Sequence, residues 1–287
     1  MYSLKFLVTP KKLCNFVISN FIKMKHILVP IGSTENVKST LQYAIDFASE
    51  ITAKVFVFRA YNVQTKAGTI INVDEIIERE TNLYLRTMVN AVDRKNIDIK
   101  LISAKGTLID SIEAIDKEIG MDLIVVGPKS NSVKEDVFLG KTSGSIVKQT
   151  DIPVLVVPNN YSYSPFKRVL TATKSGIIKN TSALKPLQVI ADKFTPIIEL
   201  LLVKTADYSE EDLLVNPPLD SLQSNINIVE SATTYQGVLT RMESHNPDLL
   251  CVFRRKRGFF TKLWEKNTVL KKEFYCDIPL LVLNGLK

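Results

Sequence analysis

The chain of 287 residues is poor in the side chains that build disulfide frameworks and metal centres. Its three cysteines, Cys14, Cys251 and Cys276, show no Cys-x-x-Cys spacing, which argues against a disulfide framework and against a zinc site. Two histidines, His26 and His245, are too few for a His-rich metal centre and are expected to be structural. No stretch approaches the roughly 18 to 20 apolar residues that a membrane helix needs. We therefore expect a globular, cytoplasmic protein without a metal.

The chain also lacks an even distribution of its net charge of +7. Residues 254–272 contain eight Lys and Arg against a single Glu, and residues 1–25 contain five Lys and no acid. These two segments carry the whole positive excess, so the remainder of the chain is mildly acidic. The positive net charge therefore comes from two segments, and it does not indicate a nucleic-acid-binding surface over the whole protein.

Residues 1–23 are basic and apolar, but they lack both the continuous apolar core and the small-residue cleavage site of a secretory signal. Met24 stands directly before the first run with strand character. We expect either translation from Met24 or a peripheral arm, with a membrane-surface or targeting segment as the alternative.

From His26 onward, short apolar runs alternate with longer stretches of helical periodicity. The last two apolar runs are continuous, as expected for strands covered by helices on both faces. This alternation predicts an α/β unit with a parallel, doubly wound, five-stranded sheet. The expected strands are residues 26–30, 54–58, 97–103, 122–126 and 153–157, and the expected helices are residues 36–51, 73–96, 107–119 and 141–150.

The same series recurs later in the chain. The apolar runs that begin at Asp122 and Pro153 return at Asp248 and Pro279, both 126 positions further on. The second copy is shorter because residues 208–224 contain two consecutive prolines, which interrupt the helix that is intact in the first copy. The predicted organisation is an extension at 1–23, a first domain at 24–158, a linker at 159–166 and a shortened second domain at 167–287.

The informative loop follows the fourth strand of the first unit. Gly127 ends that strand, and Gly140, Lys141, Thr142 and Ser143 open the next helix. A glycine lets the backbone approach an anion, and a helix N-terminus favours negative charge, so this arrangement predicts a phosphate cradle. A side chain at Gly140 would obstruct the contact and could also force an unfavourable backbone angle. The loop is not a P-loop, because position 135, which that motif fills with glycine, is a glutamate.

At this point the sequence resembles the universal stress protein family, specifically its tandem two-domain members, over about residues 24–287. The resemblance rests on the Ile-Leu-Val-Pro strand that ends at Pro30, the Asp-Leu-Ile-Val-Val-Gly strand that ends at Gly127, and the Ile-Pro-Val-Leu-Val-Val run at 152–157. It implies a stress-response function and two units of strand order 3-2-1-4-5. It also implies that the units pair through their final strands as an intramolecular pseudo-dimer.

Nucleotide-binding members of that family carry Gly-x2-Gly-x9-Gly-(Ser/Thr) in this loop, and usually an Asp two residues after the proline of the first strand. Here the second glycine of the motif is Ser130, the final Ser/Thr is Lys141, and the Asp is Gly32. Lys141 either pairs with a phosphate or is an exposed lysine at a helix start. The resemblance implies an adenine nucleotide, ATP with Mg²⁺, in the first unit only; the alternative is a nucleotide-free scaffold. The candidate nucleotide-binding residues are Pro30, Gly32, Val126, Gly127, Lys129, Ser130, Gly140, Lys141, Thr142 and Ser143.

In the second unit the four motif positions hold no glycine, so nucleotide binding is not expected there. The loop instead mixes basic and aromatic side chains. It either covers the empty cleft as a solvated loop or docks a protein partner, and a nucleic acid is the least favoured reading. No nucleophile elbow or carboxylate pair identifies a catalytic group, so at most slow nucleotide hydrolysis is expected, and association of two chains is left open. The candidate partner-binding residues are Arg254, Arg255, Lys256, Arg257, Phe259, Phe260 and Trp264.

Overall fold

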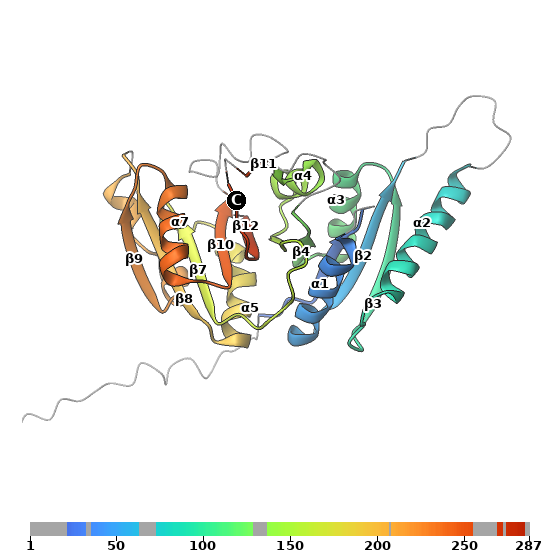
Figure 1. Cartoon of the computed structure of the whole chain (residues 1–287), viewed down its shortest axis with the longest axis horizontal. Coiled ribbons are helices and arrows are strands. Elements are labelled where there is room, and N and C mark those ends of the chain that lie inside the picture. Colours follow the sequence, from blue (N-terminus) through green and yellow to red (C-terminus); the bar gives the residue numbers. More distant parts are fainter. Residues whose placement is uncertain are drawn as a thin grey trace, which may run out of the picture.

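A computed structural model of the chain describes two α/β units that share one ten-stranded sheet (Figure 1). The described residues are 22–32, 36–62, 73–128, 137–206, 208–254, 269–271 and 274–284. None of the helices in these ranges is long and apolar enough to cross a membrane.

The first unit is a parallel sheet in the order β3-β2-β1-β4-β6, which is the predicted 3-2-1-4-5 order. Helices pack on both of its faces, as the continuous apolar strands predict. Its elements are β1 (His26–Pro30), α1 (Val37–Ile51), β2 (Lys54–Tyr61), α2 (Val73–Asn90), β3 (Ile99–Lys105), α3 (Leu108–Ile119), β4 (Leu123–Val126), β5 (Val137–Leu139), α4 (Lys141–Gln149) and β6 (Val154–Val156).

The main difference from the sequence prediction in this unit is the end of α2. The apolar periodicity predicts a helix to residue 96, but α2 ends at Asn90 and β3 begins at Ile99. Lys95 and Asn96 have φ of 49° and 54°, in the left-handed region, and a helix cannot continue through that conformation. A tight turn therefore occupies the last part of the predicted helix.

The second unit repeats the order as β12-β10-β7-β8-β9. Between β8 and β9, where the first unit has α2, the described residues form only a 3₁₀ turn and one short helix. Pro217 and Pro218 open that short helix, which agrees with the predicted interruption. The elements are β7 (Arg168–Thr173), η1 (Thr181–Leu184), α5 (Lys185–Phe194), β8 (Ile197–Lys204), η2 (Glu210–Leu213), α6 (Pro217–Asp220), β9 (Asn225–Glu230), α7 (Thr234–His245), β10 (Leu249–Arg254), β11 (Val269–Leu270) and β12 (Leu280–Asn284).

The repeat is not kept at the position of α4. The offset of 126 residues places the counterpart of α4 at residues 267–275, but the described part of that range contains no helix. Val269–Leu270 instead forms the strand β11, which pairs antiparallel with β5 of the first unit. Among its described residues, the second unit therefore has a strand where the repeat places part of the counterpart of α4.

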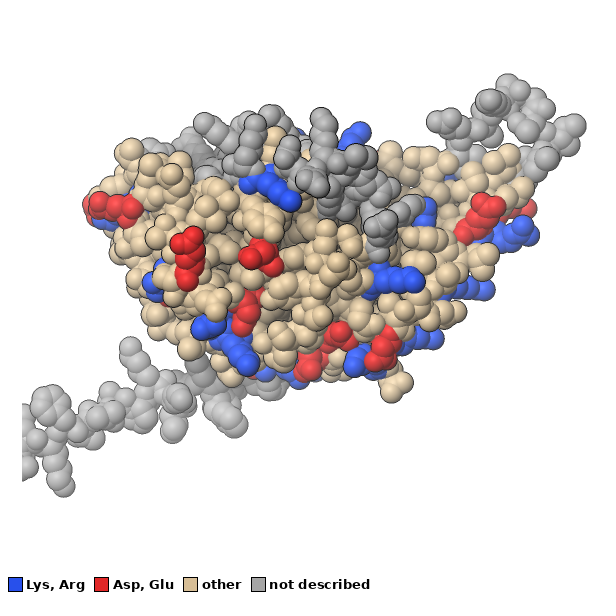
Figure 2. Space-filling model, in the orientation of Figure 1, with Lys and Arg blue, Asp and Glu red and all other residues tan. Residues whose placement is uncertain are grey.

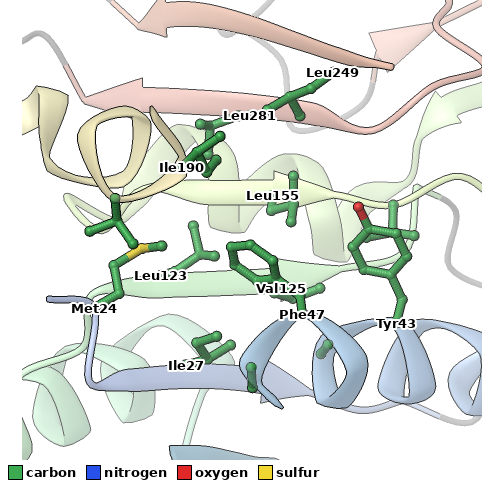
Figure 3. Close-up of a cluster of buried hydrophobic side chains, with 14 of the residues drawn as sticks. Met24, Ile27, Tyr43, Phe47, Leu123, Val125, Leu155, Ile190, Leu249 and Leu281 are labelled. Atoms are coloured by element: carbon green, nitrogen blue, oxygen red, sulfur yellow. The ribbon is translucent and has the colours of Figure 1, made fainter. Parts of the chain in front are cut away.

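The two units meet through their final strands, as predicted. β6 and β12 pair antiparallel, with Leu155 opposite Leu281. Each face of the continuous sheet carries one apolar cluster, and both clusters contain residues of both units. Figure 3 shows part of one cluster, where Phe47 of α1 and Ile190 of α5 lie over the central strands. The chain is therefore an intramolecular pseudo-dimer with a shared core.

The described surface carries both signs of charge. On the face shown in Figure 2, basic and acidic side chains lie among one another and do not separate into two regions. This face is therefore not generally basic. That agrees with the sequence, in which the positive excess lies in residues 1–25 and 254–272.

Candidate functional site

The candidate site lies at the carboxyl end of β4, where two hydrogen bonds hold the start of α4. The Ser143 hydroxyl donates to the Gly127 carbonyl over 2.6 Å. The Gly140 N–H donates to the Pro128 carbonyl over 2.9 Å. The carboxyl ends of parallel strands are the usual ligand-binding edge of such a sheet, so these bonds place a helix N-terminus at that edge.

The same two bonds decide which donors can face a ligand. Ser143 is buried with its hydroxyl proton already donated, and the Gly140 N–H is also used. Lys141 and Thr142 are exposed, and neither has a side-chain partner among the described residues. The first N–H groups of a helix have no acceptor within the helix, and the first turn of α4 contains no acid. The outward donors are therefore the backbone and side chains of Lys141 and Thr142, in the positive field of the helix dipole.

Gly127 and Gly140, the two motif glycines, differ in why a side chain would be unfavourable at each position. Gly140 is the N-cap of α4 with φ −70° and ψ 170°, a conformation open to any residue. The expectation that a side chain at Gly140 would force an unfavourable backbone angle is therefore wrong, and only the steric argument against a side chain at this buried position remains. A Cβ on Gly127 would lie 3.1 Å from the Thr40 hydroxyl of α1, so packing alone already disfavours a side chain there.

At the end of β1, the expected site residues lie beside two that sequence reasoning missed. Gly32 is exposed, and its carbonyl accepts a 2.6 Å hydrogen bond from the Tyr84 hydroxyl of α2. The Arg59 guanidinium of β2 lies 4.2 Å from the centroid of the Tyr84 ring. No local motif marks Tyr84, whereas the parallel order of β1 and β2 could have placed Arg59 at this edge. Pro30 is half-buried at the end of β1.

Of the three remaining candidate residues, Val126 alone lies within the described part of the chain. Val126 is buried in β4 with its side chain in the core. Lys129 and Ser130 lie outside the described residues. The described part of the chain also contains no group of three His, Cys, Asp or Glu side chains arranged to hold a metal ion.

The equivalent edge of the second unit is closed by its own backbone. The Gly176 N–H donates to the Asp212 carbonyl over 3.0 Å, and the Asn216 amide holds both the N–H and the carbonyl of Ile178. A Cβ on Gly176 would lie only 2.5 Å from the Leu214 carbonyl oxygen. The segment after β8 therefore lies directly against the loop after β7.

A buried side chain also replaces the glycine at the end of the fourth strand of this unit. Phe253 occupies the position of Gly127 and is 4% exposed, within the core cluster that both units share. Together with the strand β11 in place of a helix, this leaves no cradle of the first unit's kind among the described residues of the second.

The basic and aromatic loop is described only at its first residue. Arg254 was expected on a partner-binding surface, but it is 5% exposed at the end of β10. Its guanidinium donates to the Val147 carbonyl of α4 and lies 3.4 Å from the Asp151 carboxylate. Burial lowers the pKa of Arg254, and the charge of Asp151 opposes that shift. Arg254 therefore belongs to the contact between the units. The other six predicted docking residues, Arg255, Lys256, Arg257, Phe259, Phe260 and Trp264, lie outside the described residues.

Asp122 and Asp248 have matching structural roles. The Asp122 carboxylate accepts the Lys25 N–H over 2.6 Å, and the Asp248 carboxylate accepts the Lys167 N–H over 2.9 Å. Each also accepts the next backbone N–H, so each carboxylate fixes the start of the first strand of its unit. Asp122 additionally pairs with Lys185 of α5, across the contact between the units.

Comparison with known proteins identifies relatives of the first unit. The model of the universal stress protein family matches residues 23–158. Universal stress protein G of Shigella flexneri is 28% identical over 91 residues, which is 32% of this chain and 63% of that protein. A universal stress protein of Methanocaldococcus jannaschii is 22% identical over 138 residues, covering 46% of this chain and 81% of that protein. The match thus spans less than two thirds of the bacterial relative.

Solved structures share the fold of both units. A universal stress protein from Archaeoglobus fulgidus superposes with a TM-score of 0.66 at 17% identity, covering 91% of this chain and 99% of its own. A functionally unknown Pseudomonas aeruginosa protein superposes with a TM-score of 0.56 at 12% identity, covering 92% of this chain and 94% of its own. These likenesses show the fold alone, whereas the family model matches the sequence itself. The first unit, over residues 23–158, is therefore a domain of the universal stress protein family.

Proposed function

We propose that the first unit binds an adenine nucleotide, that the second unit does not, and that nucleotide occupancy serves as a regulatory signal in a stress response. The observation that carries this proposal is the start of α4. It is fixed against the end of β4, it presents Lys141 and Thr142 outward, and its first turn has no acid. This donor set suits a phosphate group.

The same geometry predicts which part of the nucleotide dominates the affinity. The phosphates would meet backbone N–H groups, a helix dipole and the Lys141 ammonium. The ribose side of the site lacks the family's Asp, because Gly32 stands there. Since the described residues offer no cluster of metal ligands, Mg²⁺ would be held mainly by the phosphates, as is usual for this ion. Binding that depends on phosphate contacts should weaken with ionic strength.

Three features of the second unit support the proposal that only the first unit binds a nucleotide. Phe253 fills the position of Gly127, β11 occupies the positions that correspond to Ser143 and Gly144 of α4, and the Leu214 carbonyl closes on Gly176. Each would obstruct a nucleotide at a different point. A single nucleotide per chain is therefore the expected stoichiometry.

The test is calorimetric titration of the full chain with ATP and Mg²⁺. Lys141→Ala should weaken binding by about tenfold, the loss expected for one charge-assisted hydrogen bond. Lys117→Ala is the matched control, because Lys117 is an exposed helical lysine in the last turn of α3, away from the site. Its affinity should equal that of the unmodified chain.

Gly140→Val tests the position of the phosphate. The backbone angles of Gly140 are open to valine, and the expected effect is loss of nucleotide binding through obstruction. Because Gly140 is buried, circular dichroism first checks that the variant folds. Absence of binding to the unmodified chain at millimolar ATP would overturn the proposal and favour a nucleotide-free scaffold. Equal affinity in the Gly140→Val and Lys141→Ala variants and the unmodified chain would place any nucleotide elsewhere.

A further inference from the structure

A cavity of about 460 Å³ lies between the two units and reaches Pro128, whose carbonyl holds the N-cap of α4. It is found where β6 ends and β12 begins. Its walls come from both units, with Pro128, Phe138 and Tyr161 on one side and Tyr275 and Asp277 on the other. Its size falls in the range of roughly 300 to 1,000 Å³ that small-molecule sites occupy.

The position related to this cavity by the internal repeat is filled by an arginine. The offset of 126 residues relates Pro128 to Arg254 and Asp277 to Asp151. On the filled side, the buried Arg254 guanidinium contacts the Val147 carbonyl and the Asp151 carboxylate. Because the strands β6 and β12 pair about a local twofold axis, the cavity is the second copy of this arginine position.

A second donor is lost on the cavity side in the same way. The Asn284 amide donates to the Asp151 carboxylate over 2.9 Å, and the repeat places Pro158 at the corresponding position. A proline side chain donates nothing. Asp277 accordingly has no hydrogen bond or ion pair within the described residues. The cavity therefore has a carboxylate of the same Asp-Ile-Pro sequence, with both of its repeat-related donors replaced by proline.

The other walls suit the flat face of a guanidinium. Tyr161 and Tyr275 line the cavity, and aromatic rings attract guanidinium groups through the ring face. The pKa of Tyr161 is raised first by burial and then by the charges of Asp248 and Asp277, so both carboxylates lie near this wall.

One further lining residue limits the class of ligand. Lys271 lines the cavity, and its ammonium lies 5.6 Å from the centroid of the Tyr275 ring. A ligand with only positive charge would be repelled by this lysine. A ligand that also carries a carboxylate could pair with Lys271 while its guanidinium pairs with Asp277.

We propose that this cavity binds a small zwitterionic guanidine, of which free L-arginine is the simplest example. Its guanidinium takes the place that Arg254 holds on the other side of the twofold axis. Asp277 accepts its hydrogen bonds, the tyrosine rings cover its face, and Lys271 pairs with its carboxylate. The proposal does not rest on nucleotide binding, although Pro128 belongs both to this cavity and to the anchor of α4.

The test titrates the full chain with three probes by calorimetry. L-arginine should bind, and L-citrulline, which replaces the guanidinium by a neutral urea group, should bind at least about tenfold more weakly. Agmatine, which lacks the carboxylate, should also bind more weakly than L-arginine, and this difference should disappear in Lys271→Gln. L-arginine that fails to bind at tens of millimolar, or citrulline that binds equally well, would overturn the proposal.

Two variants test the residues. Asp277→Asn should weaken L-arginine binding by about tenfold or more without changing ATP affinity, whereas Glu243→Gln, an exposed carboxylate on α7, should change neither. Pro128→Arg restores the guanidinium of the filled side and should abolish L-arginine binding in a protein that unfolds at the same or a higher temperature. Unchanged L-arginine affinity in a folded Asp277→Asn or Pro128→Arg protein would contradict the assignment.

Discussion

Leu155 of β6 and Leu281 of β12 lie directly opposite each other in the antiparallel ladder that joins the two units. They are also the same position of the internal repeat, because Pro153 and Pro279 begin the two matching runs. A local twofold axis therefore passes between these two leucines. Each is 1% exposed, and both belong to the cluster that continues from one unit into the other.

Leu281→Ala should therefore destabilise the whole chain and not the second unit alone. Truncation of a buried leucine costs about 2 to 5 kcal/mol, and the shared clusters predict a single cooperative transition in urea. The matched control is Ile226→Ala on the edge strand β9, where the side chain is 42% exposed and the expected change is within about 0.5 kcal/mol. Two separate transitions, or equal effects of the two variants, would contradict a shared core.

This pairing could be predicted from the sequence because its signals are local. The runs that become β4, β6, β10 and β12 are continuous and apolar, and such runs indicate strands buried on both faces. The start of α4 could also be predicted, since Gly140 precedes helical periodicity and the helix begins at Lys141.

The parts that could not be predicted depend on partners distant in the sequence. Val269–Leu270 forms a strand because β5 is available to pair with it, although the repeat predicts a helix there. Arg254 stands in a basic run, which normally indicates an exposed surface, but its partners Val147 and Asp151 lie more than 100 residues away. Tyr84 reaches the Gly32 carbonyl because α2 packs against β2, β3 and α1, beyond the end of β1.

A buried ion pair distinguishes the second sheet from the first. Glu199 of β8 is fully buried, and its carboxylate accepts from the Arg241 guanidinium and lies 3.2 Å from Nδ1 of His245. Strand register places Phe56 at the same position of the first unit. Burial alone would raise the pKa of Glu199, but the Arg241 hydrogen bonds and the neighbouring positive charges hold it below its ordinary value.

A carboxyl whose pKa is lowered in the folded state stabilises the fold above its unfolded pKa, which is about 4.3 for glutamate. This stability is lost as the pH falls through the lowered folded value. We expect Glu199→Gln to cost about 3 to 5 kcal/mol at neutral pH, because it leaves Arg241 without its partner charge. Urea unfolding between pH 3 and pH 7 measures this difference. On acidification, the Glu199→Gln variant should lose less stability than the unmodified chain.

The double variant Glu199→Phe with Arg241→Leu gives the control. It replaces the ion pair by apolar side chains and gives position 199 the phenylalanine that the first unit has at the equivalent Phe56. Replacing a buried ion pair by apolar side chains often leaves the free energy of unfolding unchanged. It should therefore be more stable than Glu199→Gln. The opposite order would mean that the ion pair itself, and not the uncompensated charge, determines stability here.

Gly176 and Gly32 stand on the loops that follow the first strand of each unit, and their surroundings predict opposite responses to alanine. A Cβ on Gly176 would meet the Leu214 carbonyl oxygen at 2.5 Å, so the backbone must shift. Gly176→Ala should lower the free energy of unfolding by about 1 to 3 kcal/mol, as overpacking does. A Cβ on Gly32 meets nothing within 4 Å, so Gly32→Ala should change stability by about 0.5 kcal/mol or less. Thermal unfolding of both variants tests the closure of the second unit, and equal melting temperatures would contradict it.

The open space at Gly32 also predicts a gain of function. The family's nucleotide-binding members usually place an Asp here, and Gly32 is exposed, without a positive φ and without neighbours that a side chain would meet. Gly32→Asp should therefore fit without rearrangement and supply an acceptor for a ribose hydroxyl. One such hydrogen bond corresponds to about a tenfold gain in ATP affinity.

Gly32→Ala separates the carboxylate from the effect of losing a glycine, since both variants restrict the backbone equally. ATP titrations of the two variants, with Mg²⁺ and at two salt concentrations, should show tighter binding only for the Asp variant. The added negative charge also repels the phosphates, and salt screens that repulsion, so the gain should be larger at high ionic strength. Equal affinity of the Asp and Ala variants would mean that the nucleotide does not reach the end of β1. The proposed site would then be reduced to the start of α4 and would recognise phosphate without recognising the nucleoside.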